Sequence, residues 1–407
     1  MPTPVALVSD EAQVSDAIAF LENRVRHDPE DALAYNKLGG YYLQDLRETG
    51  ALQYLDLMAR AAHASLASVP VVRNTEGLSL LELTEFSTHE FARARNHALD
   101  LIRIDPAKEY PYEMLFDSEV ELGHYHAAAT AFTQMLRHSG GINANTETRR
   151  ARLNTLYGDT VGAARHLSTA IALDLHLATP PREVVAWSYW QLGETAFNRG
   201  NYVDAEQYYR DALISFPGYF RALASLGRVR AARGDLQDGI VQYKAAIDVL
   251  PDPVFVAALG DLYALSGQKK AAADQYALVQ AIGHLSTLAG VLYNRPLALF
   301  YADHDMKAQE AYANASREYA KRRDIYGADA VAWTALKAGG IKEARASIKV
   351  AMRLGTLDAK LFYHSGMIAR AAGDRTTARN DLQRALELNP VFDPLQAIKA
   401  RAALAAL

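Results

Sequence analysis

Three short clusters of titratable residues are the places where this sequence could do chemistry. His124–His126 holds two imidazoles, but a tight zinc site needs further ligands and the sequence offers none nearby. Asp303–Asp305 could bind a cation, yet we expect a helix N-cap region, where carboxylates accept free backbone N–H groups. Lys321–Arg323 could attract an anion, yet we expect a solvated last helical turn. None of the three predicts a reaction.

The sequence also lacks the short motifs that mark common catalytic sites. It contains no G-x-G-x-x-G, no G-x4-G-K-[ST], no H-E-x-x-H and no G-x-S-x-G. The absence of cysteine excludes disulfides, thiolate metal sites and cysteine nucleophiles. We therefore expect a protein that is not an enzyme and that uses no cofactor and no metal.

Composition favours a folded helical chain. Of the 407 residues, 50% are hydrophobic and 22% are charged, which supports a large core and argues against disorder. The formal net charge of -4 lacks the basic excess that phosphate binding requires, so we expect no nucleic-acid partner. No stretch approaches the roughly 18 apolar residues of a membrane-spanning helix, so we expect no membrane span.

The elements that must position any site follow from an internal repeat. Between residues 187 and 251 one pattern occurs twice, at an offset of 34 residues. The matched pairs are Leu192 and Leu226, Gly193 and Gly227, Ala205 and Gly239, Tyr209 and Tyr243, Ala212 and Ala246, and Pro217 and Pro251. A fixed period of this length is typical of solenoids built from stacked units.

These residues resemble the tetratricopeptide repeat (TPR) family, whose unit follows W-x2-L-G-x2-Y, then A-x3-F, then P. The resemblance implies an all-α, right-handed superhelical solenoid of about ten helical hairpins, because the register extends over nearly the whole chain. The region from Arg317 to Pro394 is also similar to the ends of many bacterial TPR proteins, which favours a bacterial source.

The register divides the chain into five segments. They are an N-terminal half-repeat or cap over 1–31, a TPR-like array over 32–177, a proline-containing linker over 178–185, a second array over 186–392 and a capping helix over 393–407. The linker holds Pro180 and Pro181, and we expect a hinge or a change of superhelical pitch there. The half-repeat lacks its first helix, which leaves two interpretations: an ordinary capping helix, or a missing upstream signal or anchor. As written we expect a cytoplasmic chain, and a periplasmic or exported one if a signal was removed.

The resemblance also implies a binding surface. In this family the first helix of each unit lines the concave face, and fixed positions along it point into the groove. The positions that we expect to bind a partner are Trp187, Trp190, Glu194, Phe197, Arg221, Arg228, Asp261, Tyr293, Tyr301, Trp333 and Tyr363, with Phe300, Tyr326, Asp329, Lys360 and Arg370 at further groove positions. Aromatic and arginine side chains dominate the energetics of protein interfaces. The alternative is that these rings pack as core.

Two classes of function therefore remain open. The first is a non-enzymatic scaffold or adaptor that binds a peptide or a helix of another protein in the aromatic-lined groove. The second is a module that senses a small molecule or glycan, stacked near Trp187, Trp190 and Tyr293. Chaperone tails are disfavoured, because no unit carries the lysine and asparagine pair of the carboxylate clamp. Self-association through the terminal repeats is a further expectation.

Overall fold

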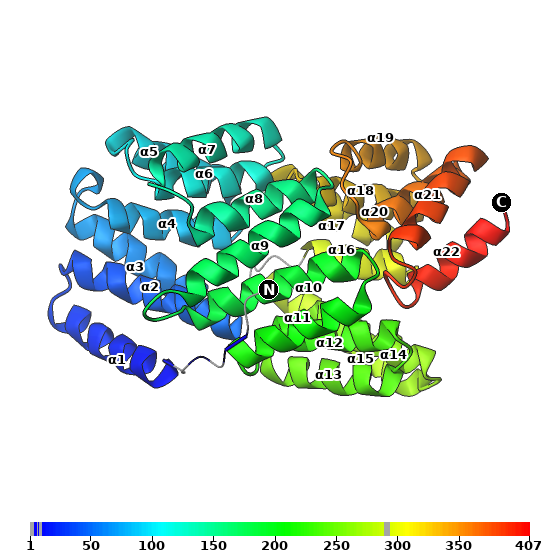
Figure 1. The fold of residues 1–407 in the computed structure, drawn as a ribbon, viewed down its shortest axis with the longest axis horizontal. Helices are drawn as coiled ribbons and strands as arrows, with labels where there is room; N and C mark the ends of the chain where they lie inside the picture. Colours follow the sequence, from blue (N-terminus) through cyan, green and yellow to red (C-terminus); the bar gives the residue numbers. More distant parts are fainter. Residues whose placement is uncertain (1–3, 6, 8–9, 289–293) are drawn as a thin grey trace. The chain divides into compact units, whose positions relative to one another are not determined.

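The computed structural model describes all residues except 1–3, 6, 8–9 and 289–293. The described residues form 22 α-helices, one short 3₁₀ turn and no strand, and consecutive helices pack as hairpins (Figure 1). The predicted all-α superhelical solenoid is confirmed. The chain divides into two compact units, which we call the N-terminal unit (residues 7–146) and the C-terminal unit (residues 147–407 together with 1–6).

The N-terminal unit contains seven helices and the 3₁₀ turn. In chain order they are α1 (Glu11–His27), α2 (Ala32–Thr49), α3 (Gln53–Ser68), η1 (Val71–Arg73), α4 (Thr75–Ser87), α5 (Phe91–Ile104), α6 (Tyr110–Glu121) and α7 (Tyr125–His138). The next helix, α8 (Ala144–Leu156), crosses the boundary between the units. α1 packs on α2 and corresponds to the predicted half-repeat.

The C-terminal unit contains the remaining helices. They are α9 (Thr160–Leu175), α10 (Arg182–Asn198), α11 (Tyr202–Ser215), α12 (Phe220–Ala232), α13 (Leu236–Val249), α14 (Pro253–Leu265), α15 (Lys269–Leu288), α16 (Asn294–Asp303), α17 (Ala308–Lys321), α18 (Ile325–Lys337), α19 (Ile341–Ala351), α20 (Ala359–Ala371), α21 (Arg375–Leu388) and α22 (Gln396–Ala405). Pro180 and Pro181 lie within this unit, between α9 and α10, and the hinge there stays a prediction.

The two best-matched hairpins repeat the same close contact between their helices. A Cβ on Gly193 of α10 would lie 2.2 Å from the Tyr209 ring of α11, and one on Gly227 of α12 would lie 2.7 Å from the Tyr243 ring of α13. Glycine is needed at both positions because the tyrosine ring occupies the space of its side chain. The 34-residue offset in the sequence is therefore an offset between equivalent helix crossings.

The second helix of many hairpins begins at a polar cap. The side chains of Asn201, Asp235 and Asp374 accept hydrogen bonds from backbone N–H groups in the first turns of α11, α13 and α21. Such caps satisfy N–H groups that have no partner inside the helix. The turn before each cap is short, which keeps the two helices of a hairpin side by side.

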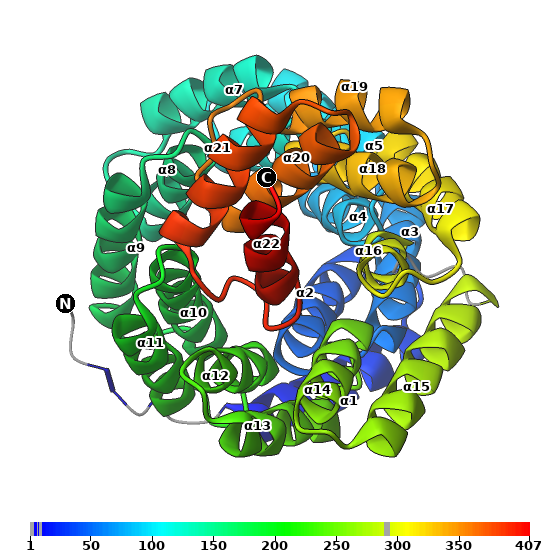
Figure 2. The same cartoon turned by 90° about the vertical axis from the view of Figure 1, so that its right-hand side faces the viewer.

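First helices line one face of the C-terminal unit. α10 contacts α12, α12 contacts α14, and the series continues through α16, α18 and α20 to α22. This row corresponds to the expected concave face, and we call it the inner row. Figure 2 shows the hairpins of this unit following one another around a curve.

The curve of the C-terminal unit brings distant residues into contact. Thr356 Oγ1 donates to the Leu156 carbonyl at 2.5 Å, and Asn389 Nδ2 donates to the Phe197 carbonyl at 2.7 Å. Late loops of the array thus touch early turns of the same unit. Throughout the part of the chain that the structure describes, no helix is both long enough and apolar enough to span a bilayer.

Candidate functional site

The predicted groove residues on α10 and α12 form an accessible aromatic surface. Trp187 and Trp190 are half-buried on α10, and Arg221 is exposed on α12. The Arg221 guanidinium lies 5.4 Å from the Trp190 ring centroid, within the range of a cation–π contact. Trp190 Nε1 donates to Ser225 Oγ at 3.0 Å, which fixes the ring on the inner row. We call Trp187, Trp190 and Arg221 the tryptophan face.

A hydrogen-bond network around the Glu194 carboxylate fixes the side chains next to the tryptophan face. Glu194 Oε1 accepts from Tyr209 OH at 2.8 Å and from Ser225 Oγ at 3.1 Å, and it pairs with the Arg228 guanidinium. Burial alone would raise the pKa of Glu194, but the Arg228 charge and these hydrogen bonds hold that pKa below its usual value. Glu194 therefore stays ionised and holds three neighbouring side chains in one arrangement.

Other predicted groove rings are packed inside the C-terminal unit. Phe197, Tyr301, Trp333 and Tyr363 are all buried, and Trp333 has no exposed surface. The Arg228 guanidinium covers the Phe197 ring at 4.0 Å. In this structure these four rings stabilise the array and present no free face to a ligand. Tyr293 lies outside the described residues.

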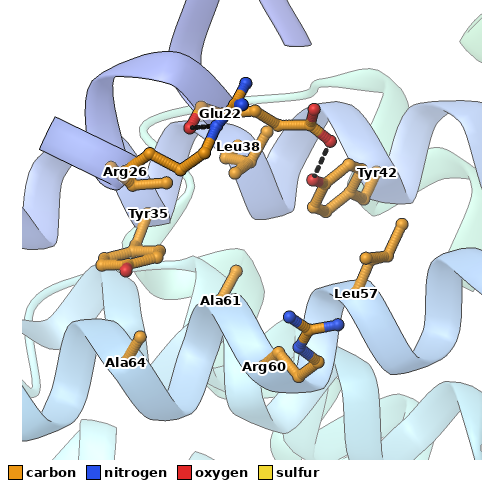
Figure 3. A pocket seen from close by; sticks show the side chains of 10 residues that line it. Glu22, Arg26, Tyr35, Leu38, Tyr42, Leu57, Arg60, Ala61 and Ala64 are labelled. Carbon is orange, nitrogen blue, oxygen red and sulfur yellow. Dashed lines mark hydrogen bonds between the residues drawn. The ribbon is translucent and has the colours of Figure 1, made fainter. Parts of the chain in front are cut away.

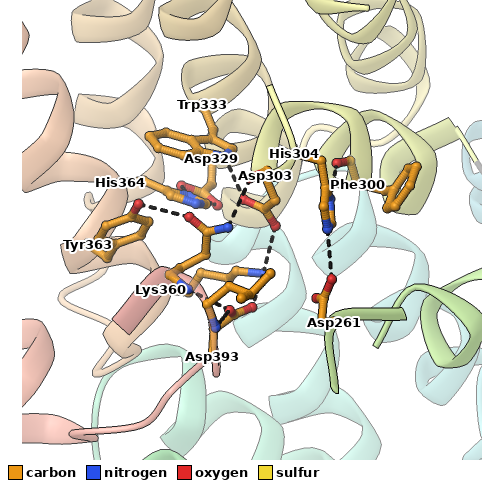
Figure 4. Close-up of polar contacts among 12 residues, drawn as sticks. Asp261, Phe300, Asp303, His304, Asp329, Trp333, Lys360, Tyr363, His364 and Asp393 are labelled. Atoms are coloured by element: carbon orange, nitrogen blue, oxygen red, sulfur yellow. Dashed lines mark hydrogen bonds and ion pairs between the residues drawn. The ribbon is translucent and has the colours of Figure 1, made fainter. Parts of the chain in front are cut away.

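A second polar cluster lies further along the inner row, around Asp303 (Figure 4). Asp303, at the end of α16, accepts from Trp333 Nε1 at 2.8 Å and faces Lys360 Nζ at 3.4 Å. Lys360 also faces Asp393 at 3.8 Å, just before α22. The backbone carbonyl of Asp303 accepts from Gln396 Nε2 at 3.1 Å. This cluster joins α16, α18, α20 and α22.

Burial and charge set the protonation of this cluster. Burial alone would raise the pKa of Asp303, but the Lys360 ammonium lowers it below its usual value. The same burial raises the pKa of Asp393, and Lys360 offsets it only in part, because Asp303 and Asp261 are also negative. Asp303 is thus the ionised partner of Lys360, and Asp393 is the carboxylate that burial penalises.

His304 extends the cluster to α14. Its Nε2 lies 2.8 Å from Asp261 Oδ1, and its Nδ1 lies 2.7 Å from the Phe300 carbonyl. Both partners are acceptors, so a doubly protonated imidazolium satisfies the two contacts. Burial alone would lower the pKa of His304, but the hydrogen bond and charge of Asp261 raise it. Tyr276 OH also donates to Asp261, at 2.8 Å.

Sequence reasoning missed half of this second cluster. It placed Asp261, Lys360 and Trp333 in the groove, but it assigned Asp303–Asp305 to a helix N-cap. That assignment is wrong for Asp303, because Asp303 ends α16 and the N-cap of α17 is Lys307. Asp393 and the helix after it were predicted only as a terminal capping helix, with no part in a polar cluster.

Near His124 the structure gives a hydrogen-bonded turn. His124 Nδ1 lies 2.7 Å from Glu119 Oε2. In the described part of the chain, no group of three or more His, Asp or Glu side chains is arranged to hold a metal ion.

The N-terminal unit holds a separate cavity of about 400 Å³ between α1, α2 and α3 (Figure 3). Its walls are mostly apolar, and Glu22, Arg26 and Arg60 are its charged lining residues. Tyr42 OH donates to Glu22 Oε1 at 2.8 Å. No sequence signal marked this cavity, because its walls come from three helices that only the tertiary packing brings together.

Comparison with known proteins agrees with the packing of α10 to α13. A tetratricopeptide repeat family model matches residues 158–220 and 191–251, the stretch in which Gly193 and Gly227 face their tyrosines. Residues 158–251 are tetratricopeptide repeats. The described array as a whole has a multi-repeat tetratricopeptide fold, as the resemblance implied. No curated protein sequence matches the chain.

Solved tetratricopeptide structures are similar to this chain at low identity. The type IV pilus biogenesis factor PilW is 19% identical over 52% of this chain and 94% of its own, with a TM-score of 0.43. A tetratricopeptide repeat protein from Parabacteroides merdae is 16% identical over 64% and 97%, with a TM-score of 0.33. The human IFIT1 dimer with PPP-AAAA is 13% identical over 94% and 96%, with a TM-score of 0.48.

The tetratricopeptide fold sets the broad class of function. It is a scaffold typical of protein–protein interaction, and proteins of this kind are generally not enzymes. Proteins built from stacked helical repeats generally bind through an extended concave surface.

Proposed function

We propose that this chain is a non-enzymatic scaffold that binds a peptide or a helix of another protein at the tryptophan face. The observation that carries the proposal is the pair Trp187 and Trp190, two half-buried rings on one helix with the exposed Arg221 over the Trp190 ring. Tryptophan and arginine are the residue types that most often dominate binding energy at interfaces.

Preorganisation supports the same surface. Trp190 is held by Ser225, and Ser225 in turn donates to the ionised Glu194. A ring that is already fixed loses little conformational entropy when a partner binds. Arg221 is exposed, its guanidinium lies over the Trp190 and Phe220 rings, and it suits a carboxylate or an aromatic ring of the partner. An apolar segment with an acidic residue therefore fits this surface best.

The test compares capture of protein partners by tagged full-length variants. The combined changes Trp187→Ala and Trp190→Ala should abolish capture of proteins that the wild type retains, while far-UV helicity stays intact. Arg221→Glu, at an exposed position, should weaken the same capture without affecting folding. Val203→Ala serves as control, because Val203 is a 66% exposed apolar residue on α11. Unfolding of the tryptophan variant would show that the rings are core, and unchanged capture by Arg221→Glu would then refute the proposal.

The cavity of the N-terminal unit favours a second candidate function, the binding of a small apolar ligand. A volume of about 400 Å³ is within the usual range for small-molecule sites. Ala64 lines this cavity, whereas Ala67, on the same helix, is exposed and outside it. Ligands that raise the melting temperature of the wild type should fail with Ala64→Leu and succeed with Ala67→Leu. Equal shifts in both variants would exclude the cavity.

A further inference from the structure

The inner row of the C-terminal unit is in contact with a segment of its own chain. This segment, Asn389–Gln396, comprises the link between α21 and α22 and the first residue of α22, and we call it the C-terminal segment. It contacts the turn between α10 and α11 at one end and the Asp303 cluster at the other. A ligand for this surface is therefore already present in the molecule.

At its first end the C-terminal segment is recognised through an amide side chain. Asn389 is 1% exposed, and its Nδ2 donates to the Phe197 carbonyl at 2.7 Å. Tyr202 OH donates to Asn389 Oδ1 at 2.5 Å and accepts from the Val391 backbone N–H at 3.0 Å. Pro390 lies 3.2 Å from the place where a Cβ on Gly200 would be. The turn between α10 and α11 thus makes hydrogen bonds to both the Asn389 side chain and the backbone that follows it.

At its second end the segment is recognised through an aromatic ring and a carboxylate. The Phe392 ring lies 5.3 Å from the Tyr363 ring, centroid to centroid. Asp393 Oδ2 faces the Lys360 ammonium at 3.8 Å. Gln396 accepts from Tyr363 OH at 3.0 Å, and its Nε2 donates to the Asp303 carbonyl. Lys360 and Tyr363 both belong to α20. One helix therefore contacts the Phe392 ring, the Asp393 carboxylate and the Gln396 amide.

The middle of the C-terminal segment is held only partly. The five consecutive residues from Val391 to Leu395 are each half-buried. The Phe392 ring packs against the core cluster that contains Tyr363, and the other contacts of the segment are hydrogen bonds and one charge pair. Another peptide with the same groups can replace all of these contacts. Release of these residues would therefore open the surface to such a peptide.

We propose that the C-terminal segment is an intramolecular ligand of the inner row, and that the partner is an extended peptide of the same chemistry. This chemistry is an amide side chain, then an aromatic residue, then directly a carboxylate, as in Asn389, Phe392 and Asp393. The inference goes beyond the proposed function, because it adds a second peptide site, made by the turn between α10 and α11 and by α20. A partner would compete with the segment, which is present at a high effective concentration, of millimolar order for a short tether.

The experiment measures binding of a fluorescein-labelled peptide of sequence ELNPVFDPLQA, residues 387–397, to the full-length chain by anisotropy. The wild type should bind it weakly. Changing Phe392→Ala and Asp393→Asn in the chain should tighten binding of the unchanged peptide by about tenfold, because the internal competitor is weakened. Asparagine at 393 can still accept from the Gln396 backbone N–H, so only the charge toward Lys360 is lost. A peptide carrying the same two changes should not bind the variant.

Three further results decide the inference. Ile398→Ala, an exposed position on α22, should bind the peptide as the wild type does, and tightening by this control would overturn the inference. Asp393→Asn alone in the chain should tighten peptide binding about threefold, and this single variant replaces the double variant in the test if the double variant unfolds. Equal affinity of a folded variant and the wild type would also overturn it. If capture at Trp187 and Trp190 persists while peptide binding fails, only this inference falls; the reverse result refutes the proposed function.

Discussion

Substitution of Asn389 by alanine should loosen the C-terminal unit as a whole. In a solenoid each hairpin contacts chiefly its neighbours, so a contact between distant hairpins adds cooperativity that nearest-neighbour packing cannot supply. Asn389 and Tyr202 are 187 positions apart and share a hydrogen bond of 2.5 Å. Asn389 is also one of the most deeply buried polar residues of the unit.

The magnitude follows from the groups that lose partners. The Phe197 carbonyl keeps its bond from the Gly200 N–H at 2.8 Å, so its lost bond from Asn389 costs about 1 kcal/mol. The Tyr202 oxygen keeps its bond from the Val391 N–H, but its O–H loses its acceptor, at about 1–3 kcal/mol. We therefore expect Asn389→Ala to lower the free energy of unfolding by about 2–4 kcal/mol. With an m-value of about 3 kcal/mol per molar urea, the midpoint falls by about 1 M.

Tryptophan emission isolates this effect. All 3 tryptophans of the chain belong to the C-terminal unit, so their fluorescence follows that unit alone, whereas far-UV circular dichroism follows both units. The urea midpoint by fluorescence should fall, and the dichroism should then show an earlier, partial transition. Tyr202→Phe keeps the bond from Asn389 to Phe197 and serves as the milder variant, at about 1 kcal/mol. A fluorescence midpoint of Asn389→Ala equal to that of the wild type would refute the reasoning.

Three shorter predictions concern the same unit. Glu194→Gln leaves the Arg228 charge unpaired, so the free energy of unfolding should fall by about 2–3 kcal/mol in urea titrations followed by fluorescence, and an unchanged midpoint would contradict the network. Gly200→Ala should lower the free energy of unfolding by about 2–3 kcal/mol, because φ is +71° and Pro390 lies close. Gly267→Ala, with φ +76° and open space, should lower it by about 1 kcal/mol. Equal losses in urea titrations of the two variants would exclude a role for the Pro390 contact. Because the pKa of His304 is raised in the folded state, its stabilising charge is fully present below about pH 6.5 and is lost as pH rises through the folded pKa. The free energy of unfolding of the wild type should therefore fall as pH rises above neutrality, and that of His304→Asn should fall less.

The fold could be predicted from the sequence because its packing is local. Each hairpin buries its small residues and tyrosines against the next helix, as Gly193 does against Tyr209, and the same crossing recurs 34 residues later. Contacts of this kind depend on side-chain size at fixed spacing, which a sequence displays directly. The positions of Trp187, Trp190 and Glu194 on the inner row followed from the same register.

The Asp303 cluster and the C-terminal segment depended on tertiary structure. Asp303 stands beside a histidine and before a helix, which resembles a cap, and only the folded chain shows that Trp333 donates to it. Asn389 meets Tyr202 because small rotations between successive hairpins add up over the whole unit. The sum of those rotations is a property of the array and has no local pattern. The sequence alone therefore determined the repeat and its inner face, and the tertiary structure decided which residues of that face are free and which already hold a segment of the chain.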